Sequence, residues 1–245
     1  EHLRDAALLH FGYPPIMGAI RGDGGEALAA ILELAKSQGL ATSLDMCAID
    51  PHSDAGRIDW AAYLARVLPH VDLLLPSWDE LGYMLEGQPP PITGRAVRRL
   101  AQRVLDMGAA ALGIKLGGAG LYLRTSPQPE RWHAAAGPFQ DIDAWSGREL
   151  YAPCVEAHEV SFVGSGGGFL AGLLAAALAG LSAPEAFLYA VAVGGASVEA
   201  PNAFDGVPDW SELSKRLRAH WAQHASDPAF ADWTILTQPH LGETV

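Results

Sequence analysis

The chain is poor in cysteine and in long apolar segments. Its only cysteines are Cys47 and Cys154, which are too few for a disulfide framework or a structural zinc site. We expect both to be buried thiols of a protein in the reducing cytoplasm. The longest apolar run, from Phe169 to Leu181, is too short to cross a bilayer. We therefore expect no membrane association.

Basic residues are also scarce. Lysine and arginine together number 16 against 28 acidic residues, which gives a formal net charge of −12. This balance disfavours binding to nucleic acids or to anionic membranes. The one basic cluster, formed by Arg95, Arg98, Arg99 and Arg103, has the spacing of a single helix face. We interpret it as a solvated face, with a ligand or partner contact as the alternative, and expect a small molecule as the partner.

Segments of strand character alternate with segments of helical periodicity, which is typical of a parallel sheet covered by helices. With 245 residues and 49% hydrophobic content, we expect one domain over residues 1–245. We predict a three-layer α/β/α fold with a doubly wound, mostly parallel sheet, which binds ligands at the carboxyl ends of its strands. The expected strands are Ala6–His10, Leu40–Met46, Val71–Leu75, Ala111–Leu116, Leu121–Thr125, Trp132–Ala135 and Val160–Val163. The expected helices are Gly25–Gln38, Trp60–Leu68 capped by Asp59, Trp78–Leu85, a helix from the cap Thr93 to Met107, Phe169–Leu181, and one from the cap Ser182 to Ala200. Residues 137–153, with Asp141 and Asp143, are expected to be irregular.

A glycine-rich turn before the apolar helix is the most informative segment. Gly164, Gly166, Gly167 and Gly168 fall within five residues, and glycine lets a ligand approach the backbone closely. The N–H groups of a helix start, together with the helix dipole, can bind an anion such as phosphate. The turn has no acidic, lysine or histidine side chain, so it resembles a phosphate site without a proton-transfer group. Close packing of the helix against the sheet is the alternative.

Two further segments carry chemical signals. Glu80 follows the third expected strand, where a carboxylate can hold magnesium through water. The alternative is that an acidic residue in a first helical turn is favoured by the helix dipole alone. Gly117 and Gly120 lie in a turn between two expected strands. This turn either exposes backbone to a nucleotide or is an ordinary connection.

Taken in this order, the three segments resemble the PfkB/ribokinase family of sugar and nucleoside kinases. The family signature D-T-x-G-A-G-D-x-F-x-A-G is matched from Ser161 to Gly172, its N-x-x-E from Ser77 to Glu80, and its T-L-G-x-x-G from Lys115 to Gly120. Asp45 resembles the family's aspartate at the end of the second strand. Gly194–Val198 resembles the late helix that flanks adenine. The resemblance spans roughly residues 6 to 210.

The resemblance implies a ribokinase-like fold and transfer of the γ-phosphoryl group of ATP to a hydroxyl of a sugar or related alcohol, with Mg²⁺. It implies an anion hole at Gly164, Ser165 and Gly166, and a role for Glu80 in placing magnesium. Dimers are common in the family, so a homodimer is also considered. The residues that would border the nucleotide are Lys115, Gly117, Gly120, Gly195 and Val198.

Departures from the family pattern leave several functions open. Gly167 occupies the position of the catalytic aspartate, and Ser161 and Ser77 replace the first aspartate and the asparagine of the two motifs. Loss of a general base typically lowers the rate by a factor of about 10²–10⁴. We also expect the chain to lack the family's first strands, its sugar-contacting glycine pair and its β lid, so the acceptor stays unnamed. The hypotheses are a carbohydrate kinase with a disabled base, a non-catalytic nucleotide- or sugar-binding relative, and an α/β domain that binds another small molecule.

Overall fold

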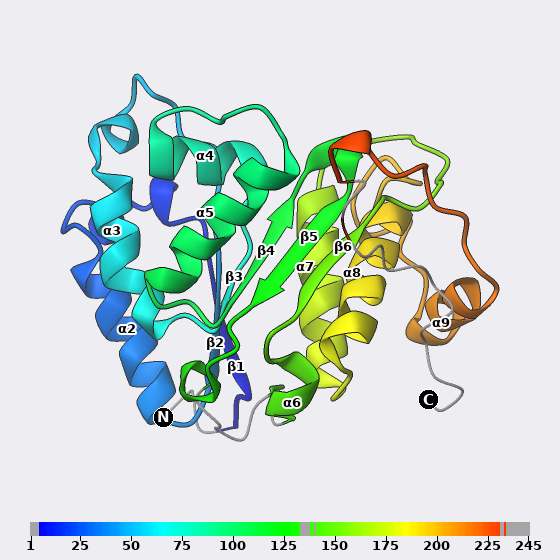
Figure 1. Cartoon of the computed structure of the whole chain (residues 1–245), viewed down its shortest axis with the longest axis horizontal. Helices are drawn as coiled ribbons and strands as arrows, with labels where there is room; N and C mark the ends of the chain where they lie inside the picture. The colour runs from blue at the N-terminus through cyan, green and yellow to red at the C-terminus, as the bar shows by residue number, and fades with distance from the viewer. Residues whose placement is uncertain (1–4, 133–137, 140, 231–232, 234–245) are drawn as a thin grey trace. The chain divides into compact units, whose positions relative to one another are not determined.

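Successive strands of this protein lie beside one another in the order of the sequence. The computed structural model describes residues 5–132, 138–139, 141–230 and 233. Six strands form one sheet in the order β1-β2-β3-β4-β5-β6, and helices flank the sheet (Figure 1). The expected α/β class is confirmed. By its contacts the chain divides into two compact units: unit 1 contains residues 1–115 and 124–148, and unit 2 contains residues 116–123 and 149–245.

Unit 1 is built on four strands that pair in parallel, as expected. Its central strands are buried because helices cover them, and every residue of the second strand is buried. Because all three connections step in the same direction, right-handed crossovers place their helices on one face of the sheet. The strands are β1 (Leu8–Gly12), β2 (Ala41–Asp45), β3 (Leu73–Leu74) and β4 (Ala111–Lys115). The helices of eight or more residues are α2 (Glu26–Ser37), α3 (Trp60–Val67), α4 (Trp78–Glu86) and α5 (Gly94–Asp106), and the short helices are α1 (Gly18–Arg21) and α6 (Ile142–Trp145).

Local side-chain bonds fix where the helices of unit 1 begin. The Asp59 carboxylate accepts a hydrogen bond from the N–H of Ala62 at 3.0 Å, and the Thr93 hydroxyl accepts one from the N–H of Ala96 at 3.2 Å. Such caps satisfy N–H groups that the first helical turn leaves without an intrahelical partner. Both caps were expected from the sequence and are confirmed.

Unit 2 consists mainly of helices that pack tightly against one another. A methyl group added at Gly172 would lie 2.8 Å from the carbonyl oxygen of Tyr189, and one added at Gly168 would lie 2.9 Å from the hydroxyl of Ser197. These glycines, four residues apart, lie on one face of their helix and let the next helix approach. The elements are β6 (Glu149–Ala152), α7 (Ser165–Leu178), α8 (Ala183–Ser197), α9 (Trp210–Arg218) and, from its first three residues, β5 (Leu121–Thr125).

Two sequence-based expectations for this region are wrong. Val160–Val163 is a loop rather than a strand, and its Phe162 and Val163 are 67% and 77% exposed. The N–H groups of Val160 and Ser161 both bond to one carbonyl oxygen, that of Val198, so no strand ladder forms. Helix α7 consequently begins at Ser165, earlier than expected, and includes the glycines in its first turn.

Residues 137–153 are more regular than expected. They contain α6 and β6, and the Asp141 carboxylate caps α6 by accepting from the N–H of Ala144 at 3.1 Å. Leu150 and Tyr151 are buried, which explains why so short a segment forms a strand. Of the expected strand Trp132–Ala135, Trp132 follows a 3₁₀ turn, and residues 133–135 lie outside the described residues.

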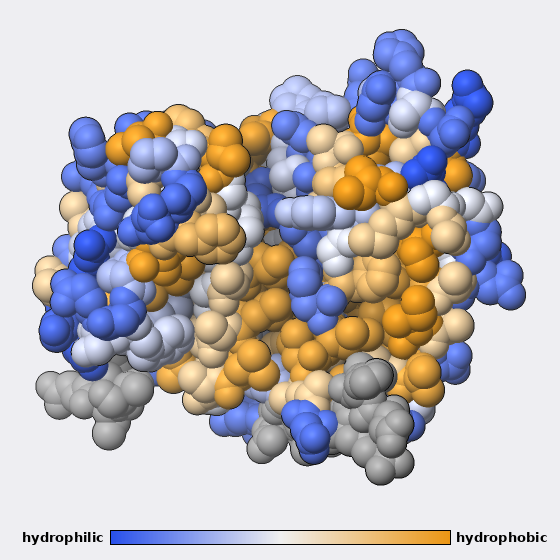
Figure 2. Space-filling model, turned by 180° about the vertical axis from the view of Figure 1, so that it is seen from behind, coloured by the Kyte–Doolittle hydropathy of each residue, from blue (hydrophilic) through white to orange (hydrophobic). Residues whose placement is uncertain are grey.

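The surface also departs from expectation in one respect. Cys47 and Cys154 are free thiols that are only partly buried. On the arginine face, Arg99 is exposed and pairs with Glu86, as expected, whereas Arg103 is partly buried and donates to the carbonyl oxygen of Leu85 at 2.8 Å. Figure 2 shows that apolar residues occupy much of the face hidden in Figure 1. Among the described helices, none has the length and hydrophobicity that a membrane crossing requires.

Candidate functional site

A buried ion pair lies at the carboxyl ends of β2 and β4 in unit 1. Lys115 Nζ donates to Asp45 Oδ1 at 2.9 Å, and the two side chains are only 15% and 3% exposed. The N–H of Met46 donates to the same oxygen at 2.9 Å. Charges this far from water require partners, so each group stabilises the other in the folded chain. The ammonium that the resemblance assigns to a nucleotide is therefore already neutralised by an aspartate of the same unit.

Glu80 lies at the same edge of unit 1, in the first turn of α4. Its Oε2 accepts from the N–H of Ser77 at 2.7 Å, while the N–H of Glu80 donates to the Ser77 hydroxyl at 3.2 Å. This reciprocal pair is a capping box, and a parallel bridge joins Ser77 to Lys115. Glu80 thus stabilises the start of α4, as in the alternative stated from the sequence, and this role uses one of its carboxylate oxygens.

A magnesium role for Glu80 remains a prediction. In the part of the chain that the structure describes, no group of three or more His, Cys, Asp or Glu side chains is arranged to hold a metal. Mg²⁺ is commonly held by one or two carboxylates, with water and substrate phosphates completing its shell. The second oxygen of Glu80 fits that kind of water-assisted contact, although it does not by itself form a cation site.

Two further titratable side chains, His10 and Cys47, lie at this edge, and neither was predicted from the sequence to belong to a site. His10 Nδ1 lies 2.8 Å from the hydroxyl of Ser43. Burial lowers the pKa of His10; Asp45 opposes this shift, and Lys115 adds to it. Burial likewise raises the pKa of the Cys47 thiol, with the charges of Glu80 and Asp45 adding to the shift. Both residues lie at or just beyond strand ends, so the rule that parallel sheets gather function there could have identified them.

The start of α7 in unit 2 holds the glycine-rich turn. Gly164 caps the helix with φ 90°, and a methyl group there would lie 2.2 Å from the Cβ of Ala203. Only glycine fits such a position without strain. The N–H of Ser165 bonds to the carbonyl oxygen of Phe162 at 3.3 Å, but within the described residues the N–H groups of Gly166 and Gly167 have no acceptor. Two backbone donors at the positive end of a long helix suit an anion.

The position of the family's base has room for a side chain. Gly167 is exposed, and a methyl group built on it meets nothing within 4 Å. Its backbone is helical, a conformation that any residue adopts. An aspartate at this position would therefore fit the structure, and the present chain simply carries no proton acceptor there.

The turn from Gly117 to Gly120 is closed by its own backbone. The N–H of Leu116 donates to the carbonyl oxygen of Gly120 at 2.9 Å. Gly120 has φ 103°, and a methyl group on it would lie 2.3 Å from the carbonyl oxygen of Ala152. Close packing explains Gly120, whereas Gly117 has open space beside it. Of the two candidate glycines, Gly117 thus leaves room for a ligand, whereas Gly120 does not.

The remaining nucleotide-bordering candidates lie at the end of α8. A methyl group on Gly195 would lie 2.1 Å from Val155 Cγ2, so this glycine permits a close backbone contact. Val198 is buried, and its carbonyl oxygen accepts from the N–H groups of Val160 at 2.8 Å and Ser161 at 3.2 Å. Their contacts are therefore structural, and their proposed contact with adenine remains a prediction.

Direct contacts gather the predicted residues of unit 2 into one neighbourhood. The segment 152–155 touches the turn at Gly120 and the helix at Gly195, and Ser197 of α8 touches Gly168 of α7. Between Glu149 and Phe230 the only lysine and arginine side chains are on α9. Within unit 2, an anion at the start of α7 would therefore be bound mainly by backbone dipoles.

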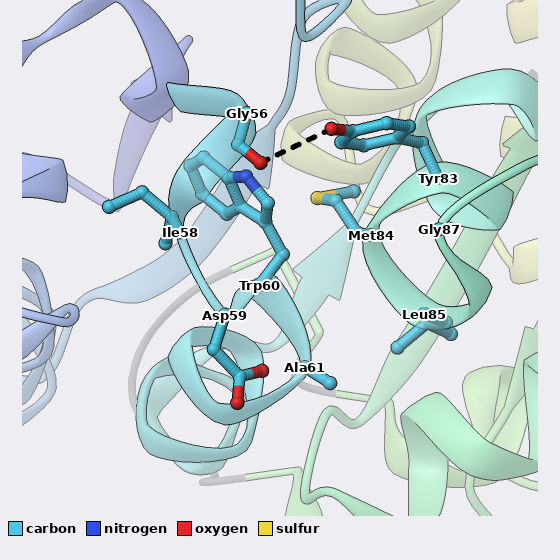
Figure 3. Close-up of a pocket in the computed structure, with 9 residues that line it drawn as sticks. All are labelled: Gly56, Ile58, Asp59, Trp60, Ala61, Tyr83, Met84, Leu85 and Gly87. Carbon is cyan, nitrogen blue, oxygen red and sulfur yellow. Dashed lines mark hydrogen bonds between the residues drawn. The ribbon is translucent and has the colours of Figure 1, made fainter. Parts of the chain in front are cut away.

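A separate cavity of about 270 Å³ lies in unit 1 beside Trp60, Met84 and Leu85 (Figure 3). Polar and apolar groups contribute equally to its wall. The Tyr83 hydroxyl in it points to the carbonyl oxygen of Gly56 at 3.5 Å. No residue with a predicted catalytic or cofactor role lines this cavity, so it is distinct from the sites described above.

Comparisons with known proteins agree with the fold and with the order of the motifs. The chain is 28% identical over 143 residues to the 2-dehydro-3-deoxygluconokinase of Bacillus subtilis (strain 168), which covers 58% of this chain and 36% of that protein. An Arabidopsis thaliana ribokinase complexed with ribose and ATP matches 87% of this chain and 56% of its own, with a TM-score of 0.63 and 19% identity. An Escherichia coli protein of the ribokinase II type, complexed with ATP and Mg²⁺, matches 89% and 61%, with a TM-score of 0.63 and 18% identity.

The chain spans less than two thirds of the length of each of these relatives. The structural matches establish a ribokinase-like fold. The sequence model of the pfkB family of carbohydrate kinases matches residues 5–210, which is most of the chain. The chain therefore belongs to the pfkB family of carbohydrate kinases.

Proposed function

We propose that this chain is a single ribokinase-like domain of a cytoplasmic kinase that transfers the γ-phosphoryl group of ATP to a hydroxyl of a sugar or related alcohol. The start of α7 is the observation that carries the proposal. There, two N–H groups without an acceptor among the described residues lie at the N-terminal end of a fourteen-residue helix. This segment is within the part of the chain that matches the family. Backbone donors fixed in this way stabilise developing negative charge without reorganising.

The residues present fit ATP better than they fit the metal. The resemblance places the anion hole at Gly164, Ser165 and Gly166. Because the N–H of Ser165 already bonds to Phe162, we propose instead that the N–H groups of Gly166 and Gly167 would bind the transferred phosphoryl group, and that Gly164 would hold their orientation through its left-handed backbone. Mg²⁺, when bound, would neutralise phosphate charge, and the uncommitted oxygen of Glu80 would contact it through water. The residues proposed to border the nucleotide are Lys115, Gly117, Gly120, Gly195 and Val198.

The relatives indicate the class of acceptor. Kinases of 2-dehydro-3-deoxygluconate and of ribose are among the proteins similar to this chain, and both act on polyhydroxylated substrates. We therefore propose a sugar or sugar acid as the acceptor. In the longer relatives, segments outside the matched part could contact the acceptor, so we leave the particular sugar unnamed.

Gly167 supports a second candidate, a non-catalytic relative that binds nucleotide or sugar. In the family pattern this position accepts the proton of the attacking hydroxyl, and here it presents only exposed backbone. Without the base the phosphoryl group could still be bound, because the anion-binding N–H groups are independent of the side chain. Binding without turnover is the expected behaviour of this candidate.

Restoring the carboxylate separates the two candidates. ATP turnover with a panel of sugars should be measured for the wild-type chain, for Gly167→Asp and for the matched control Gly167→Asn. Because the site is open, all three should fold equally. If the chain is a kinase with a disabled base, Gly167→Asp should raise turnover by about 10²–10⁴, whereas Gly167→Asn should not.

Calorimetric titration with ATP and Mg²⁺ completes the experiment. Tight binding to all three proteins without turnover in any of them would favour the non-catalytic relative. Absence of binding to ATP and to every sugar of the panel in all three would contradict both candidates and favour an α/β domain for another small molecule.

A further inference from the structure

The cavity beside Trp60 in unit 1 has no role in the proposed kinase reaction. Its volume is about 270 Å³, and its lining residues fall within two short stretches, 56–61 and 83–87 (Figure 3). The first stretch lies between β2 and α3 and includes the first turn of α3, and the second is the end of α4. Both stretches lie within unit 1. The walls of the cavity are therefore complete within this one unit.

The size of the cavity suits a small ligand. An engineered cavity of about 150 Å³ holds benzene, and pockets for drug-sized ligands begin at about 300 Å³. A volume of about 270 Å³ lies between the two, which is room for one ring with a short chain. Trp60, Met84 and Leu85 are buried and offer apolar contacts to such a body. Methionine is flexible enough to adapt to its shape.

The main-chain and aromatic parts of the wall are fixed by their own contacts. The indole N–H of Trp60 donates to the carbonyl oxygen of Ala55 at 2.8 Å, and the Trp60 ring lies 4.9 Å from that of Tyr63. Gly87 ends α4 with φ 78°, and its N–H donates to the carbonyl oxygen of Tyr83 at 2.8 Å. A wall that is ordered before binding loses little conformational freedom when a ligand enters.

Two polar groups of the wall are available as acceptors. One carboxylate oxygen of Asp59 accepts from the N–H of Ala62 at 3.0 Å, while the other has no donor or cation among the described residues. The carbonyl oxygen of Gly56 faces the Tyr83 hydroxyl at 3.5 Å, which is longer than the usual O–H···O distance of about 2.7–2.8 Å. The cavity is therefore better prepared for a ligand that donates hydrogen bonds than for one that accepts them.

The charge of the wall has one sign. Among the described residues that line the cavity, Asp59 is the one charged side chain. Arg57 pairs with Asp54 at 3.3 Å, and Arg103 donates to the carbonyl oxygen of Leu85 at 2.8 Å, so both nearby guanidinium groups have other partners. Indole and phenol rings attract cations, and the wall carries one of each. The electrostatics favour a ligand of positive charge.

We propose that this cavity is a binding site for a small organic ammonium ion with an apolar body of about one ring. The ammonium group pairs with the free oxygen of Asp59, which is exposed, and the apolar body packs against Trp60 and Met84. Figure 3 shows the Met84 side chain extending from α4 toward Trp60. The site requires neither ATP nor a sugar, so its test is independent of the kinase proposal.

The first experiment compares three probes of similar shape and different charge. Calorimetric titration of the full chain should show saturable 1:1 binding of 2-phenylethylammonium. This cation should bind at least about fivefold more tightly than 3-phenylpropionate, because Asp59 attracts the cation and repels the anion, with neutral 2-phenylethanol between them. Absence of binding, equal affinities for the three probes, or preference for the anion would overturn the proposal.

The second experiment removes the charge of Asp59 and keeps its capping function. Asparagine caps helices about as well as aspartate, so Asp59→Asn should fold normally. It should weaken binding of the ammonium probe about three- to fivefold, the upper range for an exposed ion pair. The control is Asp209→Asn, which makes the same change at the cap of α9 in unit 2 and should leave the affinity unchanged. An unchanged affinity in Asp59→Asn, or an equal loss in both variants, would overturn the proposal.

Nuclear magnetic resonance locates the bound probe. Titration with 2-phenylethylammonium should shift the backbone amide signals of residues 56–61 and 83–87, and Ala61→Leu, which places a larger side chain in the cavity wall, should abolish these shifts. Shifts centred on the start of α7 would mean that the cation binds elsewhere. That result, or shifts that persist in a folded Ala61→Leu variant, would overturn the proposal.

Discussion

The carboxyl edge of unit 1 and the start of α7 in unit 2 contrast in how they present charge. The unit 1 edge holds Asp45, Lys115 and Glu80, and each of these side chains has a partner within the unit. The start of α7 has no charged side chain, and two of its backbone N–H groups have no acceptor among the described residues. The first region uses charge to hold the fold, whereas the second leaves polar groups available to a ligand. A region rich in charged side chains is thus not necessarily the one best prepared to bind an anion.

The largest effect should come from breaking the buried pair of unit 1. Asp45→Ala would leave the Lys115 ammonium buried without its partner, which typically costs about 3–5 kcal/mol of unfolding free energy. Urea denaturation of the variant measures this cost. The control is Asp54→Ala, whose pair with Arg57 is exposed at 76% and 78% and should change stability by less than about 1 kcal/mol. Equal losses of unfolding free energy in the two variants would show that the buried Asp45–Lys115 pair contributes no more than the exposed Asp54–Arg57 pair.

A smaller effect should separate two glycines at the start of α7. Gly164→Ala must place a side chain at φ 90° and against Ala203, which should lower the unfolding free energy by at least about 1–2 kcal/mol. Gly167→Ala meets open space in a helical conformation and should raise it by about 0.4–1 kcal/mol. Thermal denaturation of both variants gives the comparison. A loss of stability in Gly167→Ala would show that this position is more constrained than its open surroundings indicate.

The smallest effect should be a pH dependence from His10. Burial lowers its folded-state pKa below the usual value of 6.5, so the folded chain binds this proton more weakly than the unfolded chain does. Stability should then be fully present above about pH 6.5 and decrease as pH falls through the folded-state pKa. His10→Gln should remove this part of the slope when urea midpoints are compared between pH 7.5 and 5.5. An unchanged slope in the variant would assign the pH dependence to other groups.

Local chemistry made part of this structure predictable. Asp59 and Thr93 were recognised as caps because a cap depends on residues three positions away. Asp45 and Lys115 were each singled out, but their pairing joins residues separated by 70 positions, and no local pattern encodes such a contact. The sequence therefore identified residues of the candidate site without showing that two of them neutralise each other.

The errors have a related cause. Val160–Val163 is as apolar as a buried strand, yet a strand also needs a neighbour with which to pair, and this segment bonds instead to the end of α8. The segment Glu149–Ala152 has a weaker pattern but forms a strand because it has a place in the sheet. In both segments tertiary contacts overrode the local pattern.

The open space beside Gly167 also bears on how this chain could change over generations. A glycine codon that ends in a pyrimidine becomes an aspartate codon through one base change. Since no neighbouring side chain occupies the space beside Gly167, the aspartate would meet no steric barrier. The ancestral chemistry of the family would then lie a single mutational step away, and populations carrying this gene could lose and regain a carboxylate there without rebuilding the surrounding helix.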